Sequence, residues 1–350
     1  METSGHSHQS PEEHPVIEVS HDSQTSPSET LDKGHNLMLR EDIVGPAWEL
    51  VMNTSFIKKF NFFPSLLTTI YLGCIILYQL AFTYVNIFQL KDQFFAVIIQ
   101  WVHTAYFWQF LGALGLGVLL YILITPVAEG GLIALIAKRQ DESFESIETK
   151  GRIGYGVSQG LIHFLPIFEL HNFLALFKLL SIITFYILLL RVFGKDYFMS
   201  ITIFMAVYLG FAFLVNILFS YARFFIIFEN KKALESLSLS VRMALMNLEI
   251  TFHLYFTLLL VYIRTFLTAL IFIVFPFIVS ALFTYITISL LQIISIGILA
   301  FLFLALLVFI SHLNSVVEIF VEAIWYNAYR KNKKHFEVGE SIHHEDKNHH

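Results

Sequence analysis

The stretch ENKKALESLSLSVRMALMN, residues 229–247, decides how the rest of the chain is interpreted. Written at helical spacing, its large apolar residues fall on one stripe, made by Leu234, Leu237, Val241, Leu245 and Leu248. Basic residues lie beside the stripe, and apolar runs of membrane length flank it at residues 198–228 and 250–275. A short, basic, amphipathic helix between two such runs is typical of a helix that lies along a membrane surface.

The composition indicates a membrane protein rather than a soluble one. Of 350 residues, 56% are hydrophobic and only 14% are charged, and Phe alone occurs 37 times. The net charge of −5 hides an uneven distribution, because acidic residues gather near the N-terminus and basic ones at the ends of apolar runs. We therefore expect membrane lipids as partners, leave protein partners or a homo-oligomer open, and expect no nucleic acid. The single cysteine, Cys74, excludes an intramolecular disulfide.

The apolar runs predict an all-α fold, a polytopic membrane bundle of about six transmembrane helices. We place the helices at residues 62–90, 106–137, 173–193, 198–228, 250–275 and 286–310, with a tight turn over 276–285. This membrane domain covers residues 39–335. The His- and Ser-rich residues 1–38 and the polar residues 336–350 contain too little apolar surface to fold, so we expect both to be disordered tails.

Three amphipathic segments, at residues 39–54, 143–160 and 233–247, each precede a pair of predicted spans. They define either three repeated units or a plain alternation of spans and basic loops. Within the second span, Gly112, Gly115 and Gly117 are small enough to permit close helix contact.

Positive charge predicts the orientation, because cytoplasmic loops collect Lys and Arg. One set of loops holds Lys58, Lys59, Lys138, Arg139, Lys150, Arg152, Lys231, Lys232, Arg242, Arg330, Lys331, Lys333 and Lys334. The opposite set holds only Lys91, Arg191 and Lys195. We therefore expect both termini, and the amphipathic helices, on the cytoplasmic side of a bacterial-type plasma (inner) membrane.

Short motifs carry a resemblance to a known group of proteins. They are IIFENKKALESLSLSVRMALMN at 226–247, AWELVMN at 47–53, TPVAEGGL at 125–132 and AIWYNAYRK at 323–331. Their order over residues 40–335 resembles bacterial six-helix membrane proteins of poorly known function, including the membrane domain of some glycerophosphodiester phosphodiesterases. In those enzymes a soluble catalytic domain follows the membrane domain. The present sequence ends at His350 without one, so we do not expect that activity here. Met243 departs from the pattern, which usually has a basic or polar residue there.

A charge at membrane depth is costly, so it usually faces a partner or water. Arg264 lies near the middle of the fifth predicted span, and its candidate partners are Glu129, Glu169, Glu318 and Glu322. A pair with Glu129 inside a cavity would suit a lipid headgroup or small anion; the alternatives are a structural ion pair or an Arg side chain that reaches the interface. Lys178, Arg191 and Arg223 lie nearer to span ends, where we expect them to anchor the helices at the interface.

Histidines gather in the tails: His6, His8, His14, His21, His35, His335, His343, His344, His349 and His350. Such loose tracts lack the fixed spacing and supporting contacts of a metal site, so we predict no metal and no cofactor. The sequence also contains no Walker A loop, GxSxG or HExxH motif, and we do not expect an enzyme.

The leading hypothesis is therefore a non-enzymatic membrane scaffold or accessory protein that engages lipids or partners through its basic amphipathic helices. The alternative is a small-solute or lipid transporter with a midplane site around Arg264 and Glu129.

The orientation is testable by accessibility. Cysteines placed at Lys138 and Lys231 in a Cys74→Ser chain should react with a membrane-impermeant maleimide from the same side, because both positions belong to the cation-rich loops. A cysteine at Lys195 should react from the other side. Labelling of intact and inverted vesicles distinguishes these results, and Lys138 and Lys231 on opposite faces would overturn the topology.

Overall fold

The computed structural model describes residues 40–140, 149–255, 258–286 and 288–348, and all regular structure in these ranges is helical. The predicted all-α fold is therefore confirmed. The elements are η1 (Arg40–Val44), α2 (Gly45–Asn53), α3 (Ser55–Ile87), α4 (Lys91–Val102), α5 (Ala105–Gln140), α6 (Thr149–Ile162), α7 (Phe164–Ala175), α8 (Leu179–Phe193), η2 (Lys195–Tyr197), α9 (Phe198–Leu218), α10 (Ala222–Glu229), α11 (Ala233–Met246), α12 (Leu248–Tyr255), α13 (Leu258–Tyr285) and α14 (Ser289–Asn348).

Several of these helices are long and apolar enough to cross a membrane. Five stretches qualify, Ser55–Val85, Ala105–Gln140, Phe198–Glu229, Ile263–Leu282 and Ser289–Lys333, and α7 with α8, bent by 45°, would make a sixth. Most large apolar side chains along them are exposed, as Trp108, Val207 and Phe301 illustrate. Apolar surface on that scale is unfavourable in water but suits lipid, which fits a multi-pass membrane protein.

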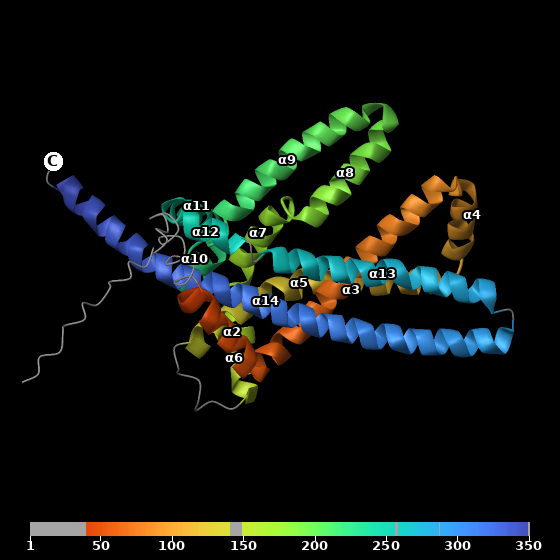
Figure 1. Cartoon of the computed structure of the whole chain (residues 1–350), viewed down its shortest axis with the longest axis horizontal. Helices are drawn as coiled ribbons and strands as arrows, with labels where there is room; N and C mark the ends of the chain where they lie inside the picture. The colour runs from red at the N-terminus through yellow and green to blue at the C-terminus, as the bar shows by residue number, and fades with distance from the viewer. Residues whose placement is uncertain (1–39, 141–148, 256–257, 287, 349–350) are drawn as a thin grey trace, which may run out of the picture.

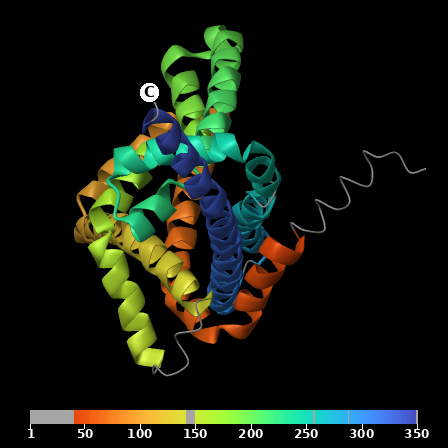
Figure 2. The same cartoon turned by 90° about the vertical axis from the view of Figure 1, so that its left-hand side faces the viewer.

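The long helices form hairpins that extend from one compact body (Figure 1). The first hairpin is α3 and α5 with α4 at its tip, the second is α8 and α9, and the third is α13 and α14. The second hairpin projects away from the other two (Figure 2). Short helices precede each hairpin, in the order that the sequence predicted; that the three units are repeats stays a prediction.

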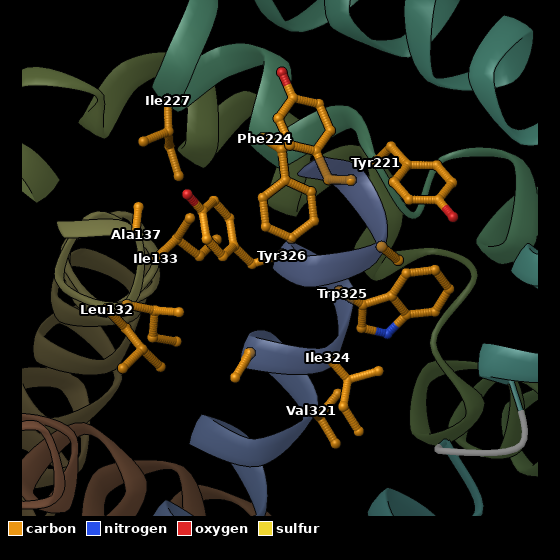
Figure 3. Close-up of a cluster of buried hydrophobic side chains, with 14 of the residues drawn as sticks. Leu132, Ile133, Ala137, Tyr221, Phe224, Ile227, Val321, Ile324, Trp325 and Tyr326 are labelled. Carbon is orange, nitrogen blue, oxygen red and sulfur yellow. The ribbon is translucent and has the colours of Figure 1, made fainter. Parts of the chain in front are cut away.

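The body is held together by apolar and aromatic side chains from helices far apart in sequence (Figure 3). Tyr221, just before α10, makes an edge-to-face contact with Trp325 of α14, with ring centroids 5.5 Å apart. Ile133 of α5 and Phe224 of α10 are fully buried in the same cluster. This cluster is the larger of the two apolar cores of the described residues. Each of its large side chains contributes about 1.5–3 kcal/mol to stability when buried.

The motifs that carry the family resemblance meet in this body. Ala47, Leu50 and Val51 of the first motif pack into the core. The core also receives residues of the other three motifs: Leu132, Ile226, Ile227, Leu237, Met243, Ala244, Ala323, Ile324, Trp325, Tyr326, Ala328 and Tyr329. Met243, the departure from the pattern, is completely buried, so an apolar residue suits this position here.

Two boundaries differ from the prediction. The turn expected over residues 276–285 is wrong, because Pro276 lies inside α13, which continues to Tyr285, and α14 begins at Ser289. Proline is tolerated within membrane helices when local contacts satisfy the freed backbone group. The tail at 336–350, expected to be disordered, is helical as far as Asn348, because extending α14 requires no new helix nucleus. The tail at 1–38 lies outside the described residues.

Glycines bring α6 directly against α5. A Cβ atom on Gly160 of α6 would lie 2.0 Å from the Val127 carbonyl oxygen, and one on Gly131 of α5 would lie 2.4 Å from the Gly156 oxygen. The segment predicted at 143–160 is therefore packed on α5 from residue 149 onward, and its earlier part is outside the described residues.

In the second predicted span, the sequence indicates three other glycines as small enough for close helix contact. A Cβ atom on Gly112, Gly115 or Gly117 would meet nothing within 4 Å, so these glycines bring no described helix of this chain into close contact. The spacing of small residues on α6, Gly156 and Gly160, was the informative pattern.

Gly160→Ala should destabilise the protein by about 1–3 kcal/mol, because the added methyl group collides with backbone rather than with a movable side chain. Gly115→Ala, inside α5 with open space around it, is the matched control and should keep or raise stability, by up to about 1 kcal/mol, because Ala favours the helix. Thermal unfolding in detergent measures both; equal melting temperatures would refute the close α5–α6 contact.

Candidate functional site: a buried ionic cluster

Arg223 of α10 lies between two carboxylates from different helices. Its Nη1 donates to Oε1 of Glu129 on α5 at 3.4 Å and to Oε1 of Glu322 on α14 at 2.5 Å. The three side chains are only 19%, 20% and 9% exposed, respectively. Charges removed from water in this way are tolerated when they are paired, so one cation holds α5 and α14 together.

The cluster extends toward the break between α7 and α8. The second oxygen of Glu129, Oε2, is 3.0 Å from Nδ1 of His171, and Nε2 of His171 is 2.7 Å from Nζ of Lys178. The Lys178 ammonium group can only donate, so Nε2 accepts and Nδ1–H of His171 donates to Glu129. We call Glu129, His171, Lys178, Arg223 and Glu322 the ionic cluster. With His171 neutral, its two carboxylates balance its two cations.

Two buried polar atoms of the ionic cluster lack a described hydrogen-bond partner. Oε2 of Glu322 and Nε of Arg223 are buried without a hydrogen-bond partner among the described residues. An acceptor and a donor left on adjacent side chains can together hold a water molecule or a small polar group.

Arg264 belongs to a second group of contacts on α14. Its Nη1 is 3.8 Å from Oε2 of Glu318 and donates to the Asn314 carbonyl oxygen at 3.3 Å. The same Glu318 oxygen accepts hydrogen bonds from Asn61 at 3.2 Å and Ser65 at 2.9 Å, both on α3.

The proposed pair of Arg264 with Glu129 is therefore not found, because Glu129 is held by Arg223 and His171. Glu169, also a candidate partner, lies exposed on α7 and joins neither group. Glu322 takes part, but with Arg223.

The sequence interpretation missed Arg223 and Lys178, which were expected to anchor the interface and instead join the cluster. A signal for Arg223 was present, since YARFFIIF surrounds it with apolar residues on both sides. Arg191 also has a protein partner: its guanidinium lies 3.2 Å from the Phe82 ring centroid on α3 and donates to Gln79 at 2.9 Å.

The basic residues predicted for the membrane surface belong to helix ends and short helices of the body, whereas α4 and η2 form the tips of the first two hairpins. They are Lys58 and Lys59 at the start of α3, Lys138 and Arg139 near the end of α5, Lys231 and Lys232 before α11, Arg242 in α11, and Arg330 and Lys331 in α14. Lys231 pairs with Glu235 at 2.6 Å and Lys331 with Asp42 at 2.8 Å. Their common location supports a single charged end, whichever side of a membrane it faces.

Helix α11 presents an unexpected face to the core. Small and polar side chains point inward together with Leu237 and Met243, whereas Leu234 and Leu245 at its outer side are 81% and 59% exposed, and Leu248 at the start of α12 is 52% exposed. Most of the apolar stripe predicted from the sequence therefore faces away from the protein. Arg242 is exposed beside it.

Comparison with family models, curated proteins and solved structures finds no match. The resemblance to bacterial six-helix membrane proteins therefore remains a prediction. Among the residues the structure describes, no group of three His, Cys, Asp or Glu residues could hold a metal ion. All ten tail histidines lie outside that part or have side chains that are not described.

Arg223→Gln should destabilise the protein by about 3–5 kcal/mol, because it leaves two buried carboxylates without their cation. Adding Glu129→Gln and Glu322→Gln should restore much of the loss by removing those charges. Lys231→Gln, which breaks a more exposed pair, should cost about 0.3–0.5 kcal/mol. Unfolding in detergent measures all three; if Arg223→Gln costs no more than Lys231→Gln, the cluster is not a stabilising junction.

Proposed function

We propose that this protein is a non-enzymatic scaffold or accessory protein of the membrane, and that it gathers anionic lipid at its basic end through α11. The observation that carries this proposal is the outward apolar stripe of Leu234 and Leu245 on the otherwise well-packed helix α11, continued by the exposed Leu248 at the start of α12.

The inner face of α11 is already packed and hydrogen-bonded within the protein. Ser240 donates a hydrogen bond to the Leu218 carbonyl oxygen at 2.8 Å and accepts one from the Tyr221 backbone N–H at 3.1 Å. The outward leucines are therefore not needed for the core of this chain. Apolar side chains next to cations, on a helix at the end of several apolar hairpins, suit the boundary between headgroups and acyl chains.

Charge adds specificity to this contact. Lys231 and Lys232 precede α11 and Arg242 lies within it, and each basic residue close to an anionic surface contributes about 1 kcal/mol. The acidic residues Glu235 and Glu249 on the same segment reduce that contribution, so we expect enrichment of anionic lipid rather than tight binding of one molecule.

A second candidate function, transport of a small solute or lipid, is favoured by one observation. Among the described residues, an acceptor on Glu322 and a donor on Arg223 have no hydrogen-bond partner, at a junction of α5, α10 and α14. The candidate transport site is therefore Arg223 between Glu129 and Glu322, rather than Arg264 with Glu129 as the sequence suggested.

The test extracts the full chain with its surrounding lipid in polymer-bounded nanodiscs from membranes of mixed phosphatidylglycerol and phosphatidylcholine. The triple change Lys231→Gln, Lys232→Gln and Arg242→Gln should lower the phosphatidylglycerol share toward that of the bulk membrane. The control, Lys91→Gln with Lys195→Gln, removes charge from the hairpin tips and should leave the share unchanged. Lipid mass spectrometry measures it; equal shares in the wild type and the triple variant would reject the proposal.

The transport candidate has a separate readout. Proteoliposomes containing a fluorescent phosphatidylglycerol would show faster loss of fluorescence to external dithionite if the protein moved lipid between leaflets, and Glu322→Gln would abolish that gain. A wild-type rate equal to that of empty liposomes would remove lipid transport, without affecting the lipid-enrichment result.

A further inference from the structure

The helix that leads into the second hairpin is broken next to the ionic cluster. Helices α7 and α8 meet at a bend of 45° between Ala175 and Leu179. Two side chains of α9 bind the backbone carbonyl groups that the break leaves open: Tyr208 donates to Leu176 at 3.0 Å and Asn216 donates to Phe177 at 2.9 Å. The break is therefore a built feature of the fold, since its freed backbone groups have partners.

Lys178 and His171 connect the two sides of the break. Lys178 is the last residue before α8 and has an extended backbone, and His171 lies about two turns earlier on α7. Nζ of Lys178 is 2.7 Å from Nε2 of His171, and Nδ1 of His171 is 3.0 Å from Oε2 of Glu129. With Lys178 as an ammonium group, this contact requires that Nε2 of His171 carries no proton. The geometry of the break is thus tied to the charge of His171.

The charged groups that face His171 come from three sides. They are Lys178, Glu129 of α5 and Arg223 of α10, with Glu322 of α14 behind Arg223. The other helices near the break add no charge of their own among the described residues: α9 has no acidic or basic residue, and the buried residues of α11 are all uncharged. On α6, Arg152 lies against α3 and Tyr155 against α5, and His163 is about two turns from His171.

A further proton on His171 would disturb this arrangement. It would place an N–H of a cationic ring opposite the Lys178 ammonium group, so two like charges would meet at hydrogen-bond distance. The contact with Glu129 would persist, because Nδ1 already donates there and a cationic ring strengthens that bond. Water can reach this end of the ionic cluster, since Lys178 is exposed and the His171 side chain is 26% exposed.

We infer that His171 is a proton-binding site that sets the angle between α7 and α8. With His171 neutral, Lys178 is held on α7 and the bend is kept. When His171 takes a proton from water, Lys178 is released and α8 turns with the rest of the second hairpin.

The far end of α8 shows which contact has to open for that movement. Arg191 holds this end to α3, where it donates to Gln79 at 2.9 Å and lies over the ring of Phe82. Both partners are uncharged, so this contact does not itself respond to the proton. Its opening would move the tip of the second hairpin away from the first.

The test places nitroxide labels on the full chain in lipid nanodiscs, at Met199→Cys and Tyr106→Cys in a Cys74→Ser background. Both positions are exposed, at the starts of α9 and α5 near the tips of the second and first hairpins. Because α8 is about 22 Å long, a turn of about 15° at the break would move its far end by about 6 Å. The distance between the labels, measured by pulsed electron paramagnetic resonance, should therefore increase by about 5 Å or more from about pH 8 to about pH 5, where histidine gains its proton.

Two variants separate the proton from the packing around it. His171→Gln can still donate to Glu129 and accept from Lys178 but binds no proton, so its distance should stay at the wild-type high-pH value throughout. Lys178→Met removes the group that holds the bend, so its distance should equal the wild-type low-pH value throughout. His253→Gln removes a histidine of α12 outside the ionic cluster and should respond to pH as the wild type does.

A wild-type distance that is the same at both pH values would overturn the inference. A pH response that persists in folded His171→Gln would also overturn it, because a carboxylate such as Glu129 or Glu322 would then be the titrating group. Melting temperatures show which variants are folded, and Lys178→Met carries the test if His171→Gln is not. Lipid enrichment at α11 has its own variants and readout, so this inference and the proposed function fail separately.

Discussion

The arrangement of the helices depends on one buried guanidinium group, that of Arg223, which would be strongly destabilising without paired carboxylates. Arg223 is tolerated because Glu129 and Glu322 approach it from two sides, and this requirement fixes helices that the hydrophobic effect alone would leave free to slide. The three residues come from different parts of the chain: α5 ends the first hairpin, α10 follows the second, and α14 belongs to the third. A single buried cation thus connects all three hairpins at their base, while the apolar helices beyond it have little protein contact and suit lipid (Figure 1).

Helix α14 provides most of the polar contacts that organise this base. Asn314, Glu318 and Glu322 follow one another every fourth residue, so they lie on one face. Asn314 contacts α3, Glu318 contacts both α3 and α13, and Glu322 contacts α10. One turn further the face becomes aromatic, with Trp325 and Tyr329 in the core. Tyr329 then donates to Glu229 at 3.0 Å, which also pairs with Lys333 at 3.2 Å. Along α14, a set of polar contacts is thus followed by aromatic core residues and then by a second set of polar contacts.

Hydropathy was sufficient to predict the helical class and, to within several residues, most of the spans, because each depends on local composition. The partners of the buried charges could not be predicted, since Arg223 and Glu322 are 99 positions apart and only the packed structure brings them together. Arg264 and Arg223 gave the same local signal, a cation in apolar surroundings, but only Arg264 was recognised. The face of α11 was also ambiguous: its apolar stripe indicated an amphipathic helix, yet small residues such as Ser236 and Ala244 made the tighter contact with the core. Likewise, Gly112 and Gly160 look alike in sequence and differ entirely in surroundings.

The unbroken course of α14 has a consequence for what the protein presents to the surrounding solution. Sixty residues at about 1.5 Å each make a rod of roughly 90 Å, and a bilayer with its headgroups is only about 40–45 Å thick. Even when strongly tilted, a helix anchored in lipid along its apolar part must therefore protrude well into the aqueous compartment beyond the body. Any torque or pull on that protruding part would be transmitted directly to Glu322 and Glu318, so the protruding part of α14 is mechanically coupled to the charged junction that holds the hairpins together.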